Sequence, residues 1–226
     1  AISPDMVLSL HNLPGLALGH VLLNRGAANC ASRGMKIRLL GKTSHASAPQ
    51  DGVSPALAVS RLIPGMQALA QGAVLDADYA LTTVTHAHLG EPTFGVAPGV
   101  AELWVTLRTV TDARMQSLVS EARALVQSEA GREGLRAEIS FDDIFEACAN
   151  TPEAVAVLHR ACTDGSIPIT LTDTPQRFSE DFGQFSKTAS AAMFWLGAGE
   201  GHPQLHNPDY DFPDALIPVG AGIFLR

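Results

Sequence analysis

Regular alternation of apolar and polar residues over positions 35–146 is the feature that most limits what this chain can fold into. The pattern predicts helices after Ser54-Pro55, where a cap precedes a first-turn proline, and from Thr111-Asp112 to about Glu129. Alternation and β-branched residues predict strands at 35–40, 79–89, 100–110 and 135–145. The resulting order β-α-β-β-α-β is that of a ferredoxin-like sandwich.

The segments on either side of this unit predict a second domain of mixed α/β type. Residues 1–32 and 147–226 contain predicted strands at 5–10 and 191–196 and predicted helices at 152–163 and 216–225. The simplest interpretation is one α/β domain interrupted by an inserted unit at 33–146. With about 110 residues and few strands, the outer domain is small. We therefore expect part of it to be missing.

Composition and charge argue against several classes of protein. The formal net charge is −8 and no basic run occurs, so nucleic-acid binding is not expected. No apolar stretch approaches the roughly 20 residues that a membrane helix needs. The three cysteines are widely spaced and form no C-x-x-C pair, which predicts a reduced, cytoplasmic protein.

Two histidines in the flanking segments are candidate metal ligands. His11 directly follows the strand predicted at 5–10, and His206 lies in a loop rich in turn formers and acids. A structural role remains the alternative for any single loop histidine. The stretch Ser179-Glu180-Asp181-Phe182 also carries two acids, which are either a helix cap with a first-turn acid or a functional pair.

The inserted unit has candidates of its own. His45 lies among small residues after a strand, where an imidazole can donate a hydrogen bond to a developing oxyanion. Arg108 lies on the strand predicted at 100–110, and its planar guanidinium can hold a substrate carboxylate. A turn histidine and a solvated strand residue are the respective alternatives. His86 and His88 share one face of a strand, which a half-exposed sheet explains.

Taken together, these segments resemble the M20 family of metallopeptidases, in particular its amidohydrolase branch of N-acyl-amino-acid, hippurate and auxin-conjugate hydrolases. Five stretches carry the likeness: SLHNLPGLALG at 9–19, GKTSHASAPQDGVSPALA at 41–58, VAPGVAELWVTLRT at 96–109, SEDFGQF at 179–185 and HNPDYDFPDALIPVGA at 206–221. The resemblance implies a catalytic domain with two divalent ions (zinc, manganese or cobalt) and an inserted lid that dimerises.

The same resemblance assigns roles to four residues. It implies that His11 and His206 are metal ligands. It implies that His45 is a lid histidine that reaches the active site of the partner subunit, and that Arg108 binds the carboxylate of the substrate. The implied activity is metal-dependent cleavage of the amide bond of N-acyl amino acids or small peptide-like conjugates, by a homodimer.

Two departures from the family pattern qualify this expectation. The other family ligands and the glutamate general base would precede Ala1, so we expect the chain to be the C-terminal part of a longer enzyme, inactive and able to lack metal on its own. Gly95 also stands where relatives usually carry an asparagine. The alternative is a catalytically degenerate homologue that acts as a dimeric small-molecule-binding protein.

Overall fold

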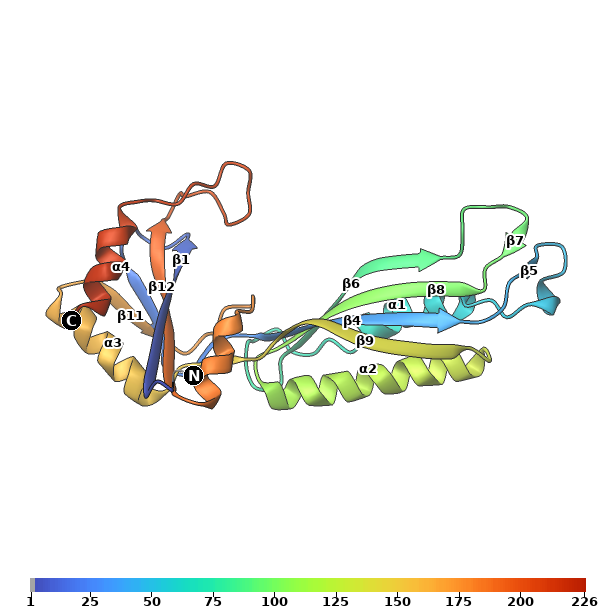
Figure 1. Cartoon of the computed structure of the whole chain (residues 1–226), viewed down its shortest axis with the longest axis horizontal. Coiled ribbons are helices and arrows are strands. Elements are labelled where there is room, and N and C mark those ends of the chain that lie inside the picture. The colour runs from blue at the N-terminus through green and yellow to red at the C-terminus, as the bar shows by residue number, and fades with distance from the viewer. Residues whose placement is uncertain (1–2) are drawn as a thin grey trace. The chain divides into compact units, whose positions relative to one another are not determined.

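The computed structural model describes residues 3–226, which form two compact units (Figure 1). The first unit comprises Ala1–Cys30 and Glu146–Arg226, and the second comprises Ala31–Phe145. No helix within residues 3–226 combines the length and the apolar character that crossing a bilayer requires.

A mixed four-stranded sheet forms the centre of the first unit. Its strands are β1 (Met6–Pro14), β2 (Val21–Asn24), β11 (Ile169–Thr172) and β12 (Ser190–Gly199), in the order β1-β12-β2-β11. β1 pairs with β12 in parallel, β12 pairs with β2 antiparallel, and β2 pairs with β11 in parallel. A small antiparallel pair joins β3 (Ala27–Asn29) to β10 (Cys148–Ala149).

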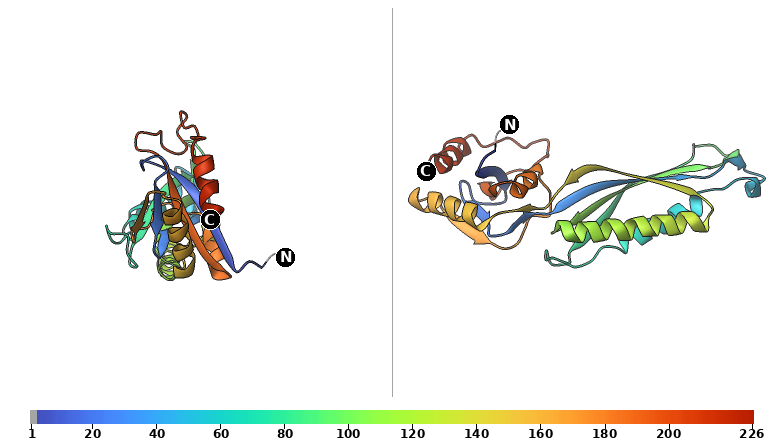
Figure 2. Two further views of the ribbon diagram at one scale, coloured as in Figure 1. Left: turned by 90° about the vertical axis from the view of Figure 1, so that its left-hand side faces the viewer. Right: turned by 60° about the horizontal axis from the view of Figure 1, so that its bottom comes forward.

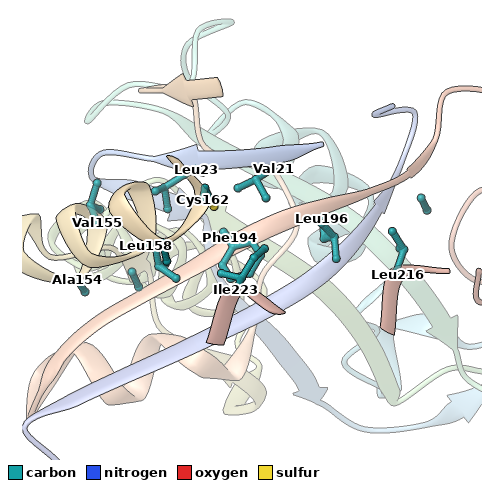
Figure 3. Close-up of a cluster of buried hydrophobic side chains, with 13 residues drawn as sticks. Val21, Leu23, Ala154, Val155, Leu158, Cys162, Phe194, Leu196, Leu216 and Ile223 are labelled. Atoms are coloured by element: carbon teal, nitrogen blue, oxygen red, sulfur yellow. The ribbon is translucent and has the colours of Figure 1, made fainter. Parts of the chain in front are cut away.

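The central strand β12 is buried on both of its faces, as strands in covered parallel sheets are. On one face, Phe194 and Leu196 pack with the helices α3 (Pro152–Asp164) and α4 (Leu216–Phe224) (Figure 3). On the other, Met193 and Trp195 pack with Phe182 of the 3-10 helix η2 (Asp181–Lys187). Full burial of such a side chain contributes about 1.5–3 kcal/mol.

The second unit is an antiparallel sheet with helices on one face. Its strands lie in the order β6-β8-β4-β9, where β4 is Ala31–Leu40, β6 is Ala80–Leu89, β8 is Val100–Thr109 and β9 is Arg136–Phe145. Helices α1 (Ala56–Gln67) and α2 (Asp112–Arg132) cover the same face (Figure 2). The turn elements β5 (Ser44–His45), β7 (Val96–Ala97) and η1 (Pro49–Asp51) complete this unit.

The structure confirms the long elements predicted by periodicity and corrects several details. Thr111 caps α2 by accepting a hydrogen bond from the Arg114 backbone N–H at 3.2 Å. Pro55 occupies the cap position of α1, one residue later than predicted, while the Ser54 hydroxyl accepts a hydrogen bond from the Ala56 backbone N–H at 3.3 Å. Leu57 of α1 is 60% exposed, so it lies outside the buried face of that helix. The strand predicted at 5–10 extends to Pro14, because residues through Leu13 keep their pairing with β12.

Candidate functional site

His11 lies within β1 rather than directly after it. It is opposite Trp195 of β12 in the parallel pair, and the two ring centroids are 5.8 Å apart. The ring of Phe178 lies 6.4 Å away on another side. His11 Nδ1 is 2.7 Å from the carbonyl oxygen of Asn12, so the Nδ1 proton is donated to the backbone and Nε2 is the nitrogen left with a free lone pair.

A buried amide supports the indole that packs on His11. Trp195 Nε1 donates to Asn24 Oδ1 at 3.1 Å, and Asn24 Nδ2 donates to the carbonyl oxygen of Thr174 at 2.8 Å. Trp195 and Asn24 are both fully buried. Outer partners of this kind fix the orientation of a ligating histidine.

Glu180 faces His11 across a short gap. Its Oε1 is 3.7 Å from His11 Nε2, and both side chains are about one-quarter exposed. Burial raises the pKa of the Glu180 carboxyl, His11 opposes that rise, and Asp181 adds to it. Glu180 stands at the cap position of η2 with Asp181 in the first turn, as the helix-cap interpretation of this pair expects, although the Glu180 side chain makes no capping hydrogen bond.

The loop that carries His206 is hydrogen-bonded to β1 at Asn12, the residue after His11. Asn12 Nδ2 donates to the hydroxyl of Tyr210, and the ring of Tyr210 meets His202 edge-on at 5.4 Å. His202 Nε2 is 2.7 Å from the carbonyl oxygen of Asp211. His206 itself has a φ of 67°, in the left-handed region that costs a residue other than glycine conformational energy.

One cavity of about 290 Å³ is lined by His11, Glu180 and His206. Imidazole nitrogen and carboxylate oxygen are donors that divalent metals accept. Within residues 3–226, however, no three side chains of the His, Cys, Asp or Glu type are close enough to hold one ion. The donor set therefore fits part of a metal centre, and a dinuclear centre needs ligands beyond these.

His45 lies exposed at the tip of the second unit. The backbone N–H of Ser47 donates to His45 Nδ1 at 3.1 Å, which places the proton of a neutral ring on Nε2 and leaves that N–H free to donate. The next residue, Ala46, donates its N–H to the carbonyl oxygen of Gly95 at 3.1 Å. A Cβ at Gly95 would meet nothing within 4 Å, so the family asparagine would fit there.

Arg108 is half-buried near the opposite end of the second unit. It lies on β8 between Ser32 of β4 and Leu81 of β6. The tip that carries His45 is joined to the start of β8 by a hydrogen bond from Gly41 N–H to the Gly99 carbonyl oxygen at 2.7 Å. At about 3.3 Å per residue along β8, roughly 25 Å separate the two ends. One unit therefore does not bring His45 and Arg108 together.

Curated relatives align with almost the whole chain. It is 26% identical to the N-acetyldiaminopimelate deacetylase of Bacillus velezensis, over 99% of this chain and 60% of that protein. It is 24% identical to the hippurate hydrolase of Campylobacter jejuni, over 98% of this chain and 58% of that protein. The chain thus spans little more than half the length of these relatives.

A solved structure shares the fold. A dinuclear metal binding peptidase of the M20 family from Bacillus subtilis matches with a TM-score of 0.78 at 19% identity, over 97% of this chain and 55% of that one. The family model for peptidase family M20/M25/M40 matches residues 56–226, which is most of the chain. This chain therefore belongs to peptidase family M20/M25/M40.

Proposed function

We propose that an enzyme containing these 226 residues is a metal-dependent amidohydrolase that cleaves N-acyl amino acids or similar small conjugates. The cavity lined by His11, Glu180 and His206 is the observation that carries the proposal, because it gathers metal-type donors in a chain of this family. Relatives named as a deacetylase of N-acetyldiaminopimelate and as a hippurate hydrolase support this class of substrate.

Each site residue has a role that follows from its chemistry. His11 and His206 would hold the metal, for which zinc, manganese and cobalt are the candidates. A bound divalent ion polarises the carbonyl to be cleaved. His45 would donate its Nε2–H to the oxyanion that develops on the substrate, as its Nδ1 contact with Ser47 favours. Arg108 would hold the free carboxylate with its planar fork.

We further propose that Ala31–Phe145 is a ferredoxin-like lid that forms a homodimer, and that the other unit is part of the catalytic domain. The strand order β6-β8-β4-β9 with two helices on one face supports the lid assignment. Dimerisation follows from the roughly 25 Å between the ends of β8 that hold His45 and Arg108. A small substrate that contacts both side chains has to take them from two copies of the chain.

We also propose a reducing, cytoplasmic location, because Cys30, Cys148 and Cys162 are buried and none of them forms a disulfide.

The replacement His45→Ala tests the function in an enzyme of the relatives' length that carries these residues. We expect kcat for an N-acetyl or N-benzoyl amino acid to fall by about 10²–10³, with metal content by elemental analysis unchanged. His86→Ala, which removes another exposed histidine of the same unit, is the matched control and should keep the parent turnover. Equal turnover in both variants would remove His45 from the mechanism. Substrate binding without any turnover in the parent would favour the catalytically degenerate, small-molecule-binding alternative.

A further inference from the structure

Exposed apolar side chains gather at the end of the second unit that carries β5 and β7 (Figure 1). Phe94 is wholly exposed there, and Leu89, Val96 and Val100 are each at least two-fifths exposed. Single exposed apolar residues are normal on a protein surface, whereas a cluster of them marks a place that a ligand or a partner covers. The cluster surrounds the tip that presents His45.

Val96 stands beside His45 in this cluster. In the antiparallel pair of β5 and β7, His45 lies directly opposite Val96. Side chains of opposite residues share a face, with their Cβ atoms about 4.5–5.5 Å apart. One residue further along, the Ala46 N–H donates to the Gly95 carbonyl oxygen at 3.1 Å and holds the two segments together. An apolar side chain therefore neighbours the imidazole whose Nε2–H is free to donate.

Val96 also lines a cavity of about 280 Å³. Thr43 and Pro98 line the same cavity, and they stand two residues from His45 and Val96 along extended chain, so the period of two places them on the same face. A cavity of about 150 Å³ with apolar walls holds benzene. The space beside His45 is therefore large enough for an aromatic ring.

The walls of this cavity favour an uncharged occupant. Among the described residues that line it, Glu91 is the one ionisable side chain. A carboxylate repels a second anion, and no cation in the lining offsets that repulsion. An apolar group gains free energy in proportion to the area that it buries against Val96, Pro98 and Val100.

The proposed reaction decides which part of the substrate lies beside His45. In that reaction the His45 N–H donates to the oxygen of the carbonyl that is cleaved. The acyl group is bonded directly to this carbonyl carbon, whereas the amino acid is attached through the amide nitrogen and its carboxylate is held by Arg108. The group nearest to His45 and Val96 is therefore the acyl group.

We propose that Val96 and the cavity that it lines bind the acyl group of the substrate, and that they favour an uncharged aromatic acyl group such as benzoyl over acetyl. This inference rests on the proposed function, because that function brings the substrate carbonyl to His45. Val96 determines specificity and takes no part in the chemical step.

Binding can be measured on the 226-residue chain without any turnover. With ¹³C-labelled valine methyl groups, N-benzoylglycine should shift the NMR signals of Val96 saturably, because an aromatic ring changes the magnetic field at methyl groups that it contacts. N-acetylglycine at the same concentrations should leave them unmoved. Val96→Thr identifies the signals by removing them. The signals of Val74, an exposed valine of the same unit outside the cluster, are the control and should not shift.

Selectivity can be measured in an enzyme of the relatives' length that carries these residues. Val96→Thr keeps the size and branching of the side chain but places a hydroxyl against the acyl group. We expect kcat/KM for an N-benzoyl amino acid to fall about tenfold, and the value for the N-acetyl derivative of the same amino acid to change by less than about twofold. Val74→Thr is the matched control and should keep both values. Thermal unfolding checks that each variant is folded.

The outcomes separate the acyl site from the proposed function. If His45→Ala lowers turnover of both substrates while Val96→Thr changes neither, the proposed function stands and the acyl site is refuted. If N-benzoylglycine shifts the Val96 signals but the longer enzyme cleaves neither substrate, binding of the acyl group is supported and the amidohydrolase activity is overturned. If the Val96 signals stay unmoved and Val96→Thr dissociates a dimer in sedimentation velocity, the cluster is a subunit contact and the acyl site is refuted.

Discussion

At the scale of single residues, the buried side-chain amide of Asn150 makes hydrogen bonds to backbone groups of two strands. Asn150 follows β10 and is 5% exposed. Its Nδ2 donates to the carbonyl oxygens of Asn24 and Met193, both at 2.9 Å, and its Oδ1 accepts from the Met193 N–H at 2.8 Å. The β12–β2 pairing ends at Phe194 and Leu23. The Asn150 side chain thus provides hydrogen-bond partners for the backbone groups just beyond that end.

Replacement of Asn150 by alanine should therefore be costly. The buried groups of Asn24 and Met193 would be left without partners, at about 2–4 kcal/mol in the free energy of unfolding. Urea denaturation of the 226-residue chain measures the difference. Asn207→Ala, on an exposed loop asparagine, is the control and should change stability by less than about 0.5 kcal/mol. Similar losses in the two variants would show that the three hydrogen bonds contribute little.

Sequence could identify the candidate site residues only in part. His11, His45, Arg108 and His206 stand in stretches that resemble a family, and their types suit metal, oxyanion and carboxylate binding. The role of Glu180 remained ambiguous, because an acid before a short helix is as common in a helix cap as in a functional site. What distinguishes the two roles is a contact with His11, 169 residues away in sequence, which local pattern does not encode.

At the scale of elements, an ion-pair network joins the two helices of the second unit. Arg61 of α1 donates to Glu129 of α2 and to Glu133, which directly follows that helix, at 2.5 Å in each case. Arg132 donates to Glu129 at 2.9 Å. The hydrogen bond from Arg61, helped by Arg132, holds the pKa of Glu129 below its ordinary value against the effect of desolvation. The contacts that Glu129 makes in this network therefore stabilise α1 against α2 only while Glu129 is ionised.

Acid should weaken this connection, and the sign follows from the lowered pKa. A carboxyl with a depressed pKa in the folded state stabilises the fold above its unfolded pKa, near 4.5, and loses that contribution as the pH falls through the folded value. We expect the urea midpoint of the parent to decrease as the pH falls below about 5, and Glu129→Gln to remove part of that decrease. Glu121→Gln, on an exposed carboxylate of the same helix, should keep the parent slope. Parallel pH profiles for all three proteins would contradict the network's role.

The elements that periodicity predicts are the long ones. β8 alternates buried Leu103, Val105 and Leu107 with outward residues over ten positions, which is enough repeats for a pattern to stand out. β2, β3, β10 and β11 are two to four residues long and were not predicted as paired strands, since their register depends on partners far away in sequence. This is why the outer unit looked poorer in strands than it is.

At the scale of the whole molecule, the chain leaves each unit close to where it entered. In the second unit, Ser32 of β4 lies opposite Phe145 of β9, so the first and last strands start and finish side by side. In the first unit, Asn29 of β3 lies opposite Cys148 of β10. Units whose ends are adjacent tolerate excision or insertion, because removing one does not stretch the other.

We therefore expect residues 31–145 to fold as an independent protein. This unit contains a four-stranded sheet and both helices that cover it, with a core that includes Leu62, Met66 and Leu118. In the first unit, β1 is an edge strand of its sheet, and exposed strand edges favour non-native pairing.

Circular dichroism should show one cooperative thermal transition for the fragment, and limited proteolysis of the 226-residue chain should leave a resistant product close to 31–145. The control is a protein in which residues 1–30 are joined to 146–226 through a short Gly-Ser linker. It should unfold at a lower temperature than the 31–145 fragment. Earlier cleavage within 31–145 than within the flanking segments would show that the second unit depends on the first for its stability.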